Sequence, residues 1–222
     1  FINYMTQILF SLIMISHVFN MFVRARASAE RIGEVMNQES SMPVRESSEP
    51  ASGIKGRVDF EHVYFSYPGA SGEPVLKDIT FTCMPGETVG IIGSTGSGKS
   101  SLVGLIPRFY DISSGSVKVD GVDVRLADPE ELRAKIAVVP QKSVLFTGTI
   151  LENIRWGKVD CTEAEAEQAA SAAQAHGFIT SFPEGYDTVL GQGGINLSGG
   201  QKQRISIARA LVRKPGILIM DD

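Results

Sequence analysis

The sequence predicts an α/β fold with a phosphate-binding loop, preceded by a helix that could cross a membrane. Three observations lead to this prediction. Strand-like runs alternate with helical runs, a glycine-rich loop ending in Lys99-Ser100 joins a predicted strand to a predicted helix, and residues 1–23 contain no Asp, Glu, Lys or Arg. Alternating strands and helices predict a sheet with the phosphate loop at the carboxyl end of a strand.

The composition permits a globular domain with a hydrophobic core and disfavours nucleic acid as its main partner. The 222 residues are 43% hydrophobic and carry a net charge of −4, which argues against nucleic acid as a partner. Cys83 and Cys161 lack metal-type spacing, so we expect reduced thiols in a reducing compartment. The chain begins at Phe1 and stops after an apolar run, and we expect it to be part of a longer protein.

Residues 1–23 are predicted to form a transmembrane helix. As a helix they would span about 34 Å, which is enough to cross a bilayer. Their polar side chains fall on an arc of roughly 140°, which favours a face toward a helix bundle or an aqueous path. These side chains are Asn3, Thr6, Gln7, Ser11 and His17. Arg24 and Arg26 follow directly, as at a cytoplasmic end. A buried helix and a signal peptide are the alternatives, but no basic segment precedes the apolar run.

Three segments are expected along the chain. Residues 1–38 form the membrane helix with its charged cytoplasmic extension, residues 39–57 form a linker, and residues 58–222 form the α/β domain. Strands are predicted at residues 58–65, 75–82, 88–92, 116–119, 136–139 and 217–220, with those at 88–92 and 217–220 buried. Helices are predicted at residues 99–106, 128–135, 162–175 and 202–213.

Residues 93–100 fit the phosphate-cradling pattern G-x-x-x-x-G-K-[ST]. Glycines let the backbone approach phosphate oxygens, and N–H groups at a helix N-terminus point at the anion. Lys99 can reach the β- and γ-phosphates, and the Ser100 hydroxyl can ligate Mg²⁺. A merely flexible loop is the alternative, which the strand–loop–helix context disfavours. We therefore expect ATP and Mg²⁺ as cofactors, with these binding residues: Gly93, Ser94, Thr95, Gly96, Ser97, Gly98, Lys99, Ser100 and Ser101.

A second motif, Leu197-Ser198-Gly199-Gly200-Gln201, lies further along the chain. Alone it predicts only a turn followed by a helix. Together with the first motif it resembles the signature of ATP-binding cassette (ABC) proteins, and the resemblance covers residues 58–222 and extends into the N-terminal segment. It implies a P-loop NTPase fold, the ABC-type nucleotide-binding domain. It also implies that the signature of one subunit caps the γ-phosphate of ATP held by the other, through Ser198, Gly199, Gly200 and Gln201.

Further residues match the family's elements in order. Tyr67 stands where an aromatic side chain stacks on the adenine, although alone it would be a turn residue. Gln141 matches the Q-loop glutamine, which contacts Mg²⁺ or the attacking water and relays the site to the membrane domain. Asp221, after an apolar strand, matches the Walker B aspartate that holds Mg²⁺. The implied metal residues are Ser100, Gln141 and Asp221.

Two segments resemble parts found in exporters. Residues 144–146 with Thr149-Ile150 resemble the segment that exporters use to meet coupling helices. Residues 191–194 resemble the exporter-type cross-talk loop, although Gln192 stands where an acidic residue is common.

The position after Asp221 departs from the family pattern. A glutamate usually polarises the attacking water there, and Asp222 is one methylene shorter. We expect a rate loss on the order of 10²–10⁴ unless a bridging water restores the contact. The family's D-loop and switch histidine would follow Asp222, and neither His62 nor His176 stands in the switch position.

The resemblance as a whole implies an ABC exporter half-transporter that couples ATP hydrolysis to export of an unidentified substrate. The implied catalytic residues are Lys99, Gln141, Ser198 and Asp222. We expect a multi-pass protein of the cell membrane, with this domain in the cytoplasm and membrane lipid around its helix. The expected partner is a second, different half-transporter, since Asp222 accompanies an intact signature; a homodimer is the alternative. A regulatory subunit with an impaired site and a soluble ABC ATPase are the rival functions, and residues 1–23 disfavour the latter.

Overall fold

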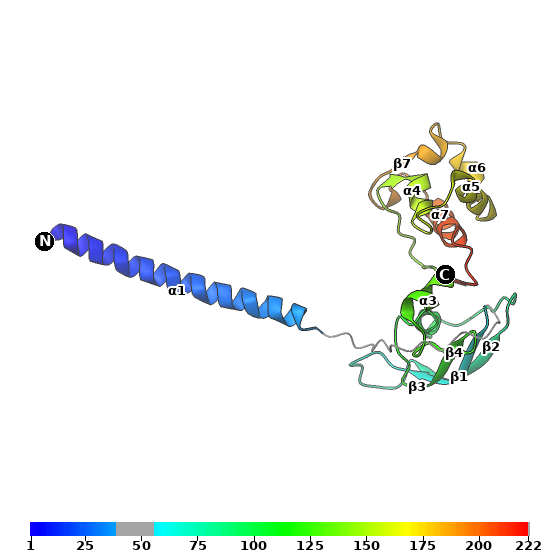
Figure 1. Ribbon diagram of the computed structural model, residues 1–222, viewed down its shortest axis with the longest axis horizontal. Helices are drawn as coiled ribbons and strands as arrows, with labels where there is room; N and C mark the ends of the chain where they lie inside the picture. Colours follow the sequence, from blue (N-terminus) through cyan, green and yellow to red (C-terminus); the bar gives the residue numbers. More distant parts are fainter. Residues whose placement is uncertain (39–55, 222) are drawn as a thin grey trace. The chain divides into compact units, whose positions relative to one another are not determined.

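The computed structural model describes residues 1–38 and 56–221, and the chain divides into two units, Phe1–Pro43 and Val44–Asp222 (Figure 1). Most of the predicted linker lies outside the described residues, as does Asp222. The predicted segment boundaries at residues 38 and 57 stay predictions.

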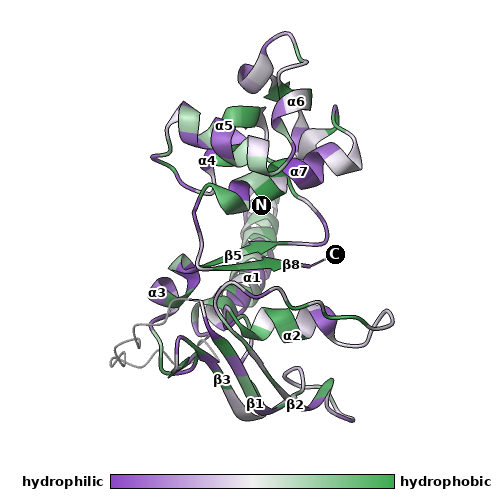
Figure 2. Cartoon of the chain, turned by 90° about the vertical axis from the view of Figure 1, so that its right-hand side faces the viewer, coloured by the Kyte–Doolittle hydropathy of each residue, from purple (hydrophilic) through white to green (hydrophobic). Residues whose placement is uncertain are grey.

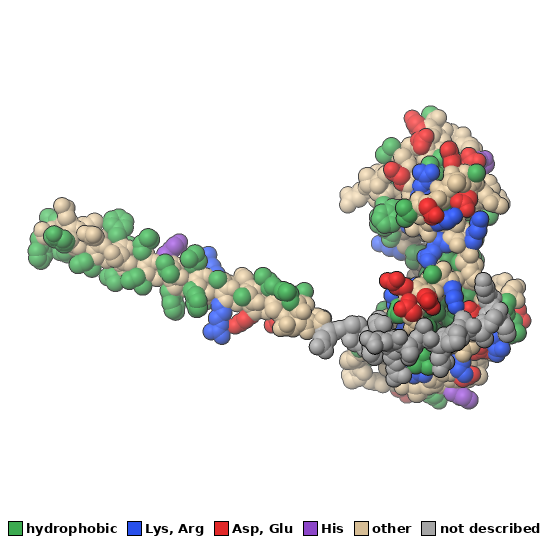
Figure 3. All heavy atoms as spheres, viewed as in Figure 1, with side chains coloured by type: hydrophobic (Ala, Val, Ile, Leu, Met, Phe, Trp, Pro, Cys, Tyr) green, Lys and Arg blue, Asp and Glu red, His purple; other side chains and the backbone are tan. Residues whose placement is uncertain are grey.

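The first unit consists of one long helix, α1 (Ile2–Met36). The predicted apolar segment and its charged extension are therefore one continuous helix. Its most apolar window has a mean hydropathy of 1.7, so α1 is long and apolar enough to cross a membrane. Figure 3 shows hydrophobic side chains along most of α1 and charged ones toward its C-terminal part. The hydroxyls of Thr6 and Ser11 donate to backbone carbonyls one turn back, which satisfies them inside the helix.

The second unit begins with a four-stranded antiparallel sheet in the order β2-β1-β3-β4. Its strands are β1 (Val58–Phe65), β2 (Leu76–Cys83), β3 (Ser114–Val119) and β4 (Val122–Asp123). A register shift in β1 between Phe60 and Val63 keeps Phe60, Val63 and Phe65 on the buried face, although strict alternation would turn Val63 outward.

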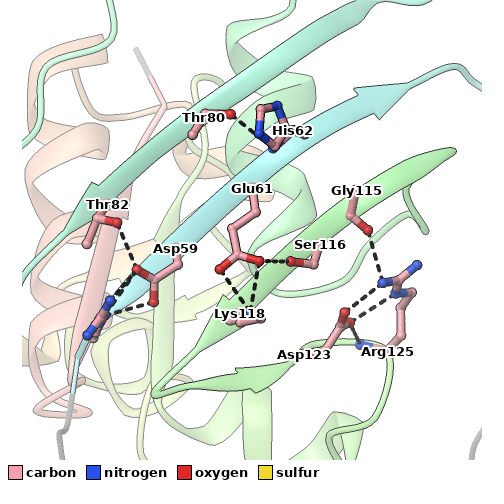
Figure 4. Close-up of polar contacts among 11 residues, drawn as sticks. Asp59, Glu61, His62, Thr80, Thr82, Gly115, Ser116, Lys118, Asp123 and Arg125 are labelled. Atoms are coloured by element: carbon pink, nitrogen blue, oxygen red, sulfur yellow. Dashed lines mark hydrogen bonds and ion pairs between the residues drawn. The ribbon is translucent and has the colours of Figure 1, made fainter.

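Polar side chains join neighbouring strands of this sheet (Figure 4). Glu61 on β1 accepts hydrogen bonds from Lys118 Nζ at 2.8 Å and from Ser116 Oγ at 2.7 Å, both on β3. Asp59 on β1 accepts a hydrogen bond from Thr82 Oγ1 on β2 at 2.8 Å. Cross-strand pairs of this kind help to fix the register of a sheet.

Two parallel strands, β5 (Ile136–Val139) and β8 (Ile217–Met220), lie side by side in Figure 2. Helices α2 (Lys99–Leu105) and α3 (Pro129–Ala134) contribute side chains to the same hydrophobic core as these two strands. Phe60 of β1, Leu105 of α2 and Ile219 of β8 are members of one hydrophobic core. This core joins the antiparallel sheet to the parallel pair through α2.

Figure 1 shows several helices in another part of this unit, and a second hydrophobic core holds this helical part together. It contains helices α4 (Ile150–Arg155), α5 (Glu163–Ala172), α6 (His176–Ile179) and α7 (Gly199–Leu211). The helical part also includes the short strands β6 (Gly148–Thr149) and β7 (Val189–Leu190), and the 3-10 turns η1 (Gly185–Asp187) and η2 (Gln192–Gly194). Buried alanines on α5 and α7, such as Ala166, Ala170 and Ala208, let these helices approach closely.

The prediction of a buried strand at residues 88–92 is wrong. This segment forms no strand with any part of the chain that the structure describes, and Ile92 is 99% exposed. A strand needs ladder partners, and an apolar run reports only a local preference for extended backbone.

The strand predicted at residues 217–220 is present as β8, but it is not buried throughout. Met220 is 62% exposed, because among the described strands only β5 pairs with β8. The expected larger α/β sheet is accordingly absent from residues 56–221, where the largest sheet is antiparallel. Helix boundaries also moved: α5 ends at Ala172, and α7 already begins at Gly199.

Candidate functional site

The glycine-rich loop leads directly into α2, as predicted. Gly96 and Gly98 have φ angles of 82° and 89°, which non-glycine residues adopt only with strain. A Cβ at Gly98 would lie 2.9 Å from Leu76 Cδ2, and one at Gly93 would lie 2.6 Å from Ser97 Oγ. These glycines are required by a close turn at the start of α2.

The Lys99 side chain folds back across this loop. Its Nζ donates hydrogen bonds to the carbonyl oxygens of Gly93 at 2.9 Å and Ser94 at 3.0 Å. Lys99 forms no ion pair with any residue in the described ranges, so its charge is compensated only by carbonyl dipoles. The Lys99 ammonium group could therefore form an ion pair with an anion bound in the loop.

Two of the predicted metal residues meet although 121 positions separate them. Ser100 Oγ, in the first turn of α2, donates a hydrogen bond to Asp221 Oδ1 at 2.9 Å. The Asp221 backbone N–H donates to the Val139 carbonyl at 3.0 Å, which ties the end of β8 to that of β5. A hydroxyl and a carboxylate oxygen are donors that Mg²⁺ prefers.

Gln141 and Asp221 both follow the carboxyl ends of the parallel strands β5 and β8. Gln141 follows Pro140 after β5, whose last residue, Val139, is paired with Met220 of β8. The Gln141 side chain is exposed and makes no hydrogen bond within residues 56–221. The structure thus places Gln141 at the same edge as Asp221, but in the described residues it makes no hydrogen bond to Ser100 or Asp221, and its predicted role in the site stays a prediction.

Tyr67 lies beside the first turn of α2. Its hydroxyl shares a hydrogen bond of 2.7 Å with Ser101 Oγ. Its ring makes edge contacts with Phe65 and Tyr110, at centroid distances of 4.9 and 5.2 Å. The predicted adenine platform is therefore attached to the helix that opens at the phosphate loop.

The signature motif forms the start of α7. Ser198 Oγ accepts a hydrogen bond from the Gln201 N–H at 3.3 Å, and Gln201 Oε1 accepts one from the Ser198 N–H at 2.9 Å. This capping box was not predicted, although the S-x-x-Q spacing indicates it. In the described part of the chain, neither Ser198 nor Gln201 contacts the phosphate loop.

A polar pair missed by the sequence analysis, the buried Asn153 and the half-buried Arg209, supports the segment after Gln141. Asn153, 1% exposed, bonds the backbone N–H and carbonyl of Phe146 at 2.9 Å each and accepts from Arg209 Nη2 at 3.0 Å. Arg209 also donates to the carbonyls of Asn153 and Val144 and lies over the Phe146 ring. Burial lowers the pKa of Arg209 below its usual range. No sequence signal marks this pair, because it depends on a contact between α4 and α7.

A cavity of about 180 Å³ adjoins this segment. Its lining includes Pro140, Phe146, Trp156 and Arg209. It lies beside the carboxyl end of β5 and not at the phosphate loop, where the segment before Gly93 is open to solvent.

Comparison with known proteins decides the family. Residues 76–222 match the family model described as ABC transporter. This chain belongs to the ABC transporter family. It is 50% identical to the uncharacterized ABC transporter ATP-binding protein YfiB of Bacillus subtilis (strain 168), over 100% of this chain and 38% of that protein. It is 42% identical to ATP-binding cassette sub-family B member 6 of Mus musculus, over 99% of this chain and 26% of that protein.

A solved bacterial Atm1-family ABC exporter with ATP bound is also similar to this ABC chain. The TM-score is 0.83 at 34% sequence identity, covering 98% of this chain and 38% of the exporter. The chain thus spans between 26% and 38% of the length of these three proteins. The predicted family and the predicted ABC-type P-loop fold are confirmed, and the chain contains the ATP-binding part of an exporter-like ABC protein. The roles of single residues stay predictions.

Proposed function

We propose that this chain binds MgATP through residues 93–101 and hydrolyses it as the ATPase part of an ABC exporter whose substrate is unidentified. The observation that carries the proposal is the hydrogen bond between Ser100 Oγ and Asp221 Oδ1, at 2.9 Å. It joins the end of the phosphate loop to the carboxyl edge of the parallel strands, where ligands bind in α/β proteins. The similarity to an exporter with ATP bound supports the same function.

The residues of the site have separable roles in this proposal. Lys99 exchanges its carbonyl partners for the β- and γ-phosphate oxygens and neutralises their charge. Ser100 and Asp221 would hold Mg²⁺, which supplies further neutralisation of the transferring phosphoryl group. Gln141 would orient the attacking water from the same edge, and Tyr67 would stack on the adenine.

The signature belongs to a second site in this proposal. Ser198, Gly199 and Gly200 form the N-terminal end of α7, and all three are exposed. They would complete the phosphate site of a partner ABC subunit. Helix α1 would cross the cell membrane as part of a multi-pass domain, with the ATP-binding part in the cytoplasm. The surface around Phe146 and Trp156 would meet the membrane domain.

The test is ATP hydrolysis by the full-length protein in detergent. Lys99→Ala should abolish hydrolysis, because the contacts to the β- and γ-phosphates are lost. Lys118→Ala, which removes an ion pair on the antiparallel sheet, is the matched control and should retain activity. Unchanged activity in Lys99→Ala would refute the proposal.

A second candidate is a subunit of a heterodimer whose own ATP site is impaired. It is favoured by Asp222 together with the complete signature of residues 197–201. In that case Ser198→Ala, which damages the partner's fast site, should lower total ATPase activity more than Asp222→Asn does. A purified homodimer with fast, Asp222-dependent hydrolysis would exclude this candidate.

A further inference from the structure

A buried carboxylate that the proposed ATP site does not use lies at the turn between β3 and β4. Asp120 is 2% exposed, and Asp120-Gly121 is the two-residue connection between these strands. Asp-Gly is favoured in such a turn because both positions take positive φ angles, which are 53° and 84° here. The turn explains an Asp at this position, but it does not require the carboxylate to be buried. The contacts of the carboxylate indicate a second role.

The Asp120 carboxylate binds the chain where it enters the domain. Its Oδ1 accepts hydrogen bonds from the backbone N–H groups of Gly56 at 2.6 Å and Arg57 at 3.1 Å, the first residues that the structure describes after residue 38. The Asp120 N–H donates to the Arg57 carbonyl at 2.9 Å. A Cβ on Gly56 would lie 2.8 Å from the carbonyl oxygen of Gly216, so Gly56 also packs against the residue before β8.

Lys135 connects the same carboxylate to the amino ends of both parallel strands. Its Nζ donates to Asp120 Oδ2 at 3.4 Å. Its carbonyl oxygen accepts hydrogen bonds from the N–H groups of Gly216 at 2.9 Å and Ile217 at 3.1 Å. Lys135 immediately precedes β5, and Ile217 is the first residue of β8. One lysine therefore joins the entry of the chain to the amino ends of β5 and β8.

The opposite ends of these two strands lead to the candidate ATP site. Each strand has four residues, which span about 13 Å, and the two are paired at every residue. At the carboxyl ends the Asp221 N–H donates to the Val139 carbonyl, and Asp221 Oδ1 accepts from Ser100 Oγ. Two short strands that are joined at both ends move as one body, so a shift at their carboxyl ends reaches Lys135.

We infer that Asp120 and Lys135 couple the entry of the chain to the nucleotide site. The coupling element has two states, in which Gly56 and Arg57 are either docked on the Asp120 carboxylate or released from it. A nucleotide bound at the phosphate loop fixes the carboxyl ends of β5 and β8, and the Lys135 contact then favours the docked state. The inference rests on the proposed function, because it requires a nucleotide at this edge of the strands.

The experiment measures hydrogen–deuterium exchange in the full-length protein with and without AMP-PNP and Mg²⁺, a nucleotide that is not hydrolysed. Peptides that span residues 56–57 report the docked state, in which both N–H groups are bonded to the carboxylate. The nucleotide should slow exchange at these amides about fivefold, the equivalent of one hydrogen bond. Lys135→Met keeps the apolar stem, removes the ammonium group and should abolish this response. AMP-PNP should still bind, with a dissociation constant raised by no more than the same factor, because the coupling is reciprocal.

Two further variants separate the contact from the fold. Asp120→Asn keeps an oxygen that can accept from the entering chain, and Asn-Gly is also favoured in this turn. It removes the charge that Lys135 contacts, so it should abolish the response as Lys135→Met does, and the double variant should respond no differently. Lys118→Met is the matched control, because Lys118 bonds to Glu61 at 2.8 Å on the antiparallel sheet and makes no bond to the entering chain. It should keep the full response.

The inference is overturned if exchange at residues 56–57 is the same with and without AMP-PNP although calorimetry shows that the unmodified protein binds it. It is also overturned if the response persists in Lys135→Met, since the effect would then reach the chain entry by another route. Failure of the proposed function is a different result: calorimetry would show that the unmodified protein binds AMP-PNP no better than its Lys99→Ala variant does.

Discussion

Single residues determine the backbone path of the phosphate loop. Gly98 combines a left-handed φ of 89° with a position where a Cβ would lie 2.9 Å from Leu76 Cδ2. Gly98→Ala should therefore lower the melting temperature and weaken ATP binding about five- to thirtyfold, since the left-handed conformation costs about 1–2 kcal/mol. Gly177→Ala is the control, because a Cβ there meets no atom within 4 Å and alanine favours the helix. Normal ATP binding by Gly98→Ala would contradict this reading of the loop.

Another residue-scale prediction concerns pH. The hydrogen bond from Lys158 Nζ at 3.0 Å is the main reason that the pKa of Glu165 falls from 4.5 to about 2; the Thr162 N–H and Lys214 add to it. A lowered carboxyl pKa stabilises the folded state above the unfolded value, and that stabilisation is lost as pH falls from about 4.5 toward about 2.

Glu165→Gln should thus lower the melting temperature at pH 7 and flatten its decline between these two pH values. Thermal melts across the acid range provide the measurement. Glu163→Gln on the same helix is the control, because the Glu163 side chain has no partner in the described residues. A variant Glu165→Gln with the unmodified protein's pH profile would show that the ion pair contributes nothing.

At the scale of elements, the sequence pattern was sufficient where packing follows local periodicity. The bounds of β1 and β5 agree with the predictions, and α2 and α3 agree to within a residue or so at each end. The pattern failed at residues 88–92, because a strand also needs a partner that no local pattern can provide. It missed β6 and β7, which are too short for periodicity and exist only through their mutual pairing.

The contact between α4 and α7 gives a prediction at this scale. Asn153→Ala removes the partner of the Phe146 N–H and one partner of half-buried Arg209, so it should destabilise the domain by about 2–4 kcal/mol. Chemical denaturation of the full-length protein measures this loss. Asn196→Ala, which removes one exposed hydrogen bond to Val189, should cost less than about 0.5 kcal/mol. Equal losses would mean that the Asn153–Arg209 pair is not a structural link.

For the whole molecule, the sequence predicted which residues form the candidate site better than it predicted their contacts. Motif order was enough to select Lys99, Ser100 and Asp221, but only the fold shows that Ser100 and Asp221 share a hydrogen bond. Gln141 could be assigned to the edge of a strand, whereas its contacts depend on the conformation after Pro140. The role of Asp222 stays a prediction from its position in the sequence.

The signature at the start of α7 caps that helix and has a second, proposed role in ATP binding, and a whole-molecule experiment can separate the two. Ser198 and Gln201 form a capping box, and Thr162 and Glu165 form the same box on α5. Ser198→Ala and Thr162→Ala should therefore destabilise the protein similarly, by about 1 kcal/mol each. Only Ser198→Ala removes a group proposed to contact the γ-phosphate on a partner subunit, and loss of such a contact lowers turnover about 10²–10³-fold. ATPase rates of the assembled transporter, normalised to folded protein, make the comparison. If both variants lose activity to the same extent, Ser198 acts only as a helix cap, and the proposed ATP site shared between subunits loses its support from this residue.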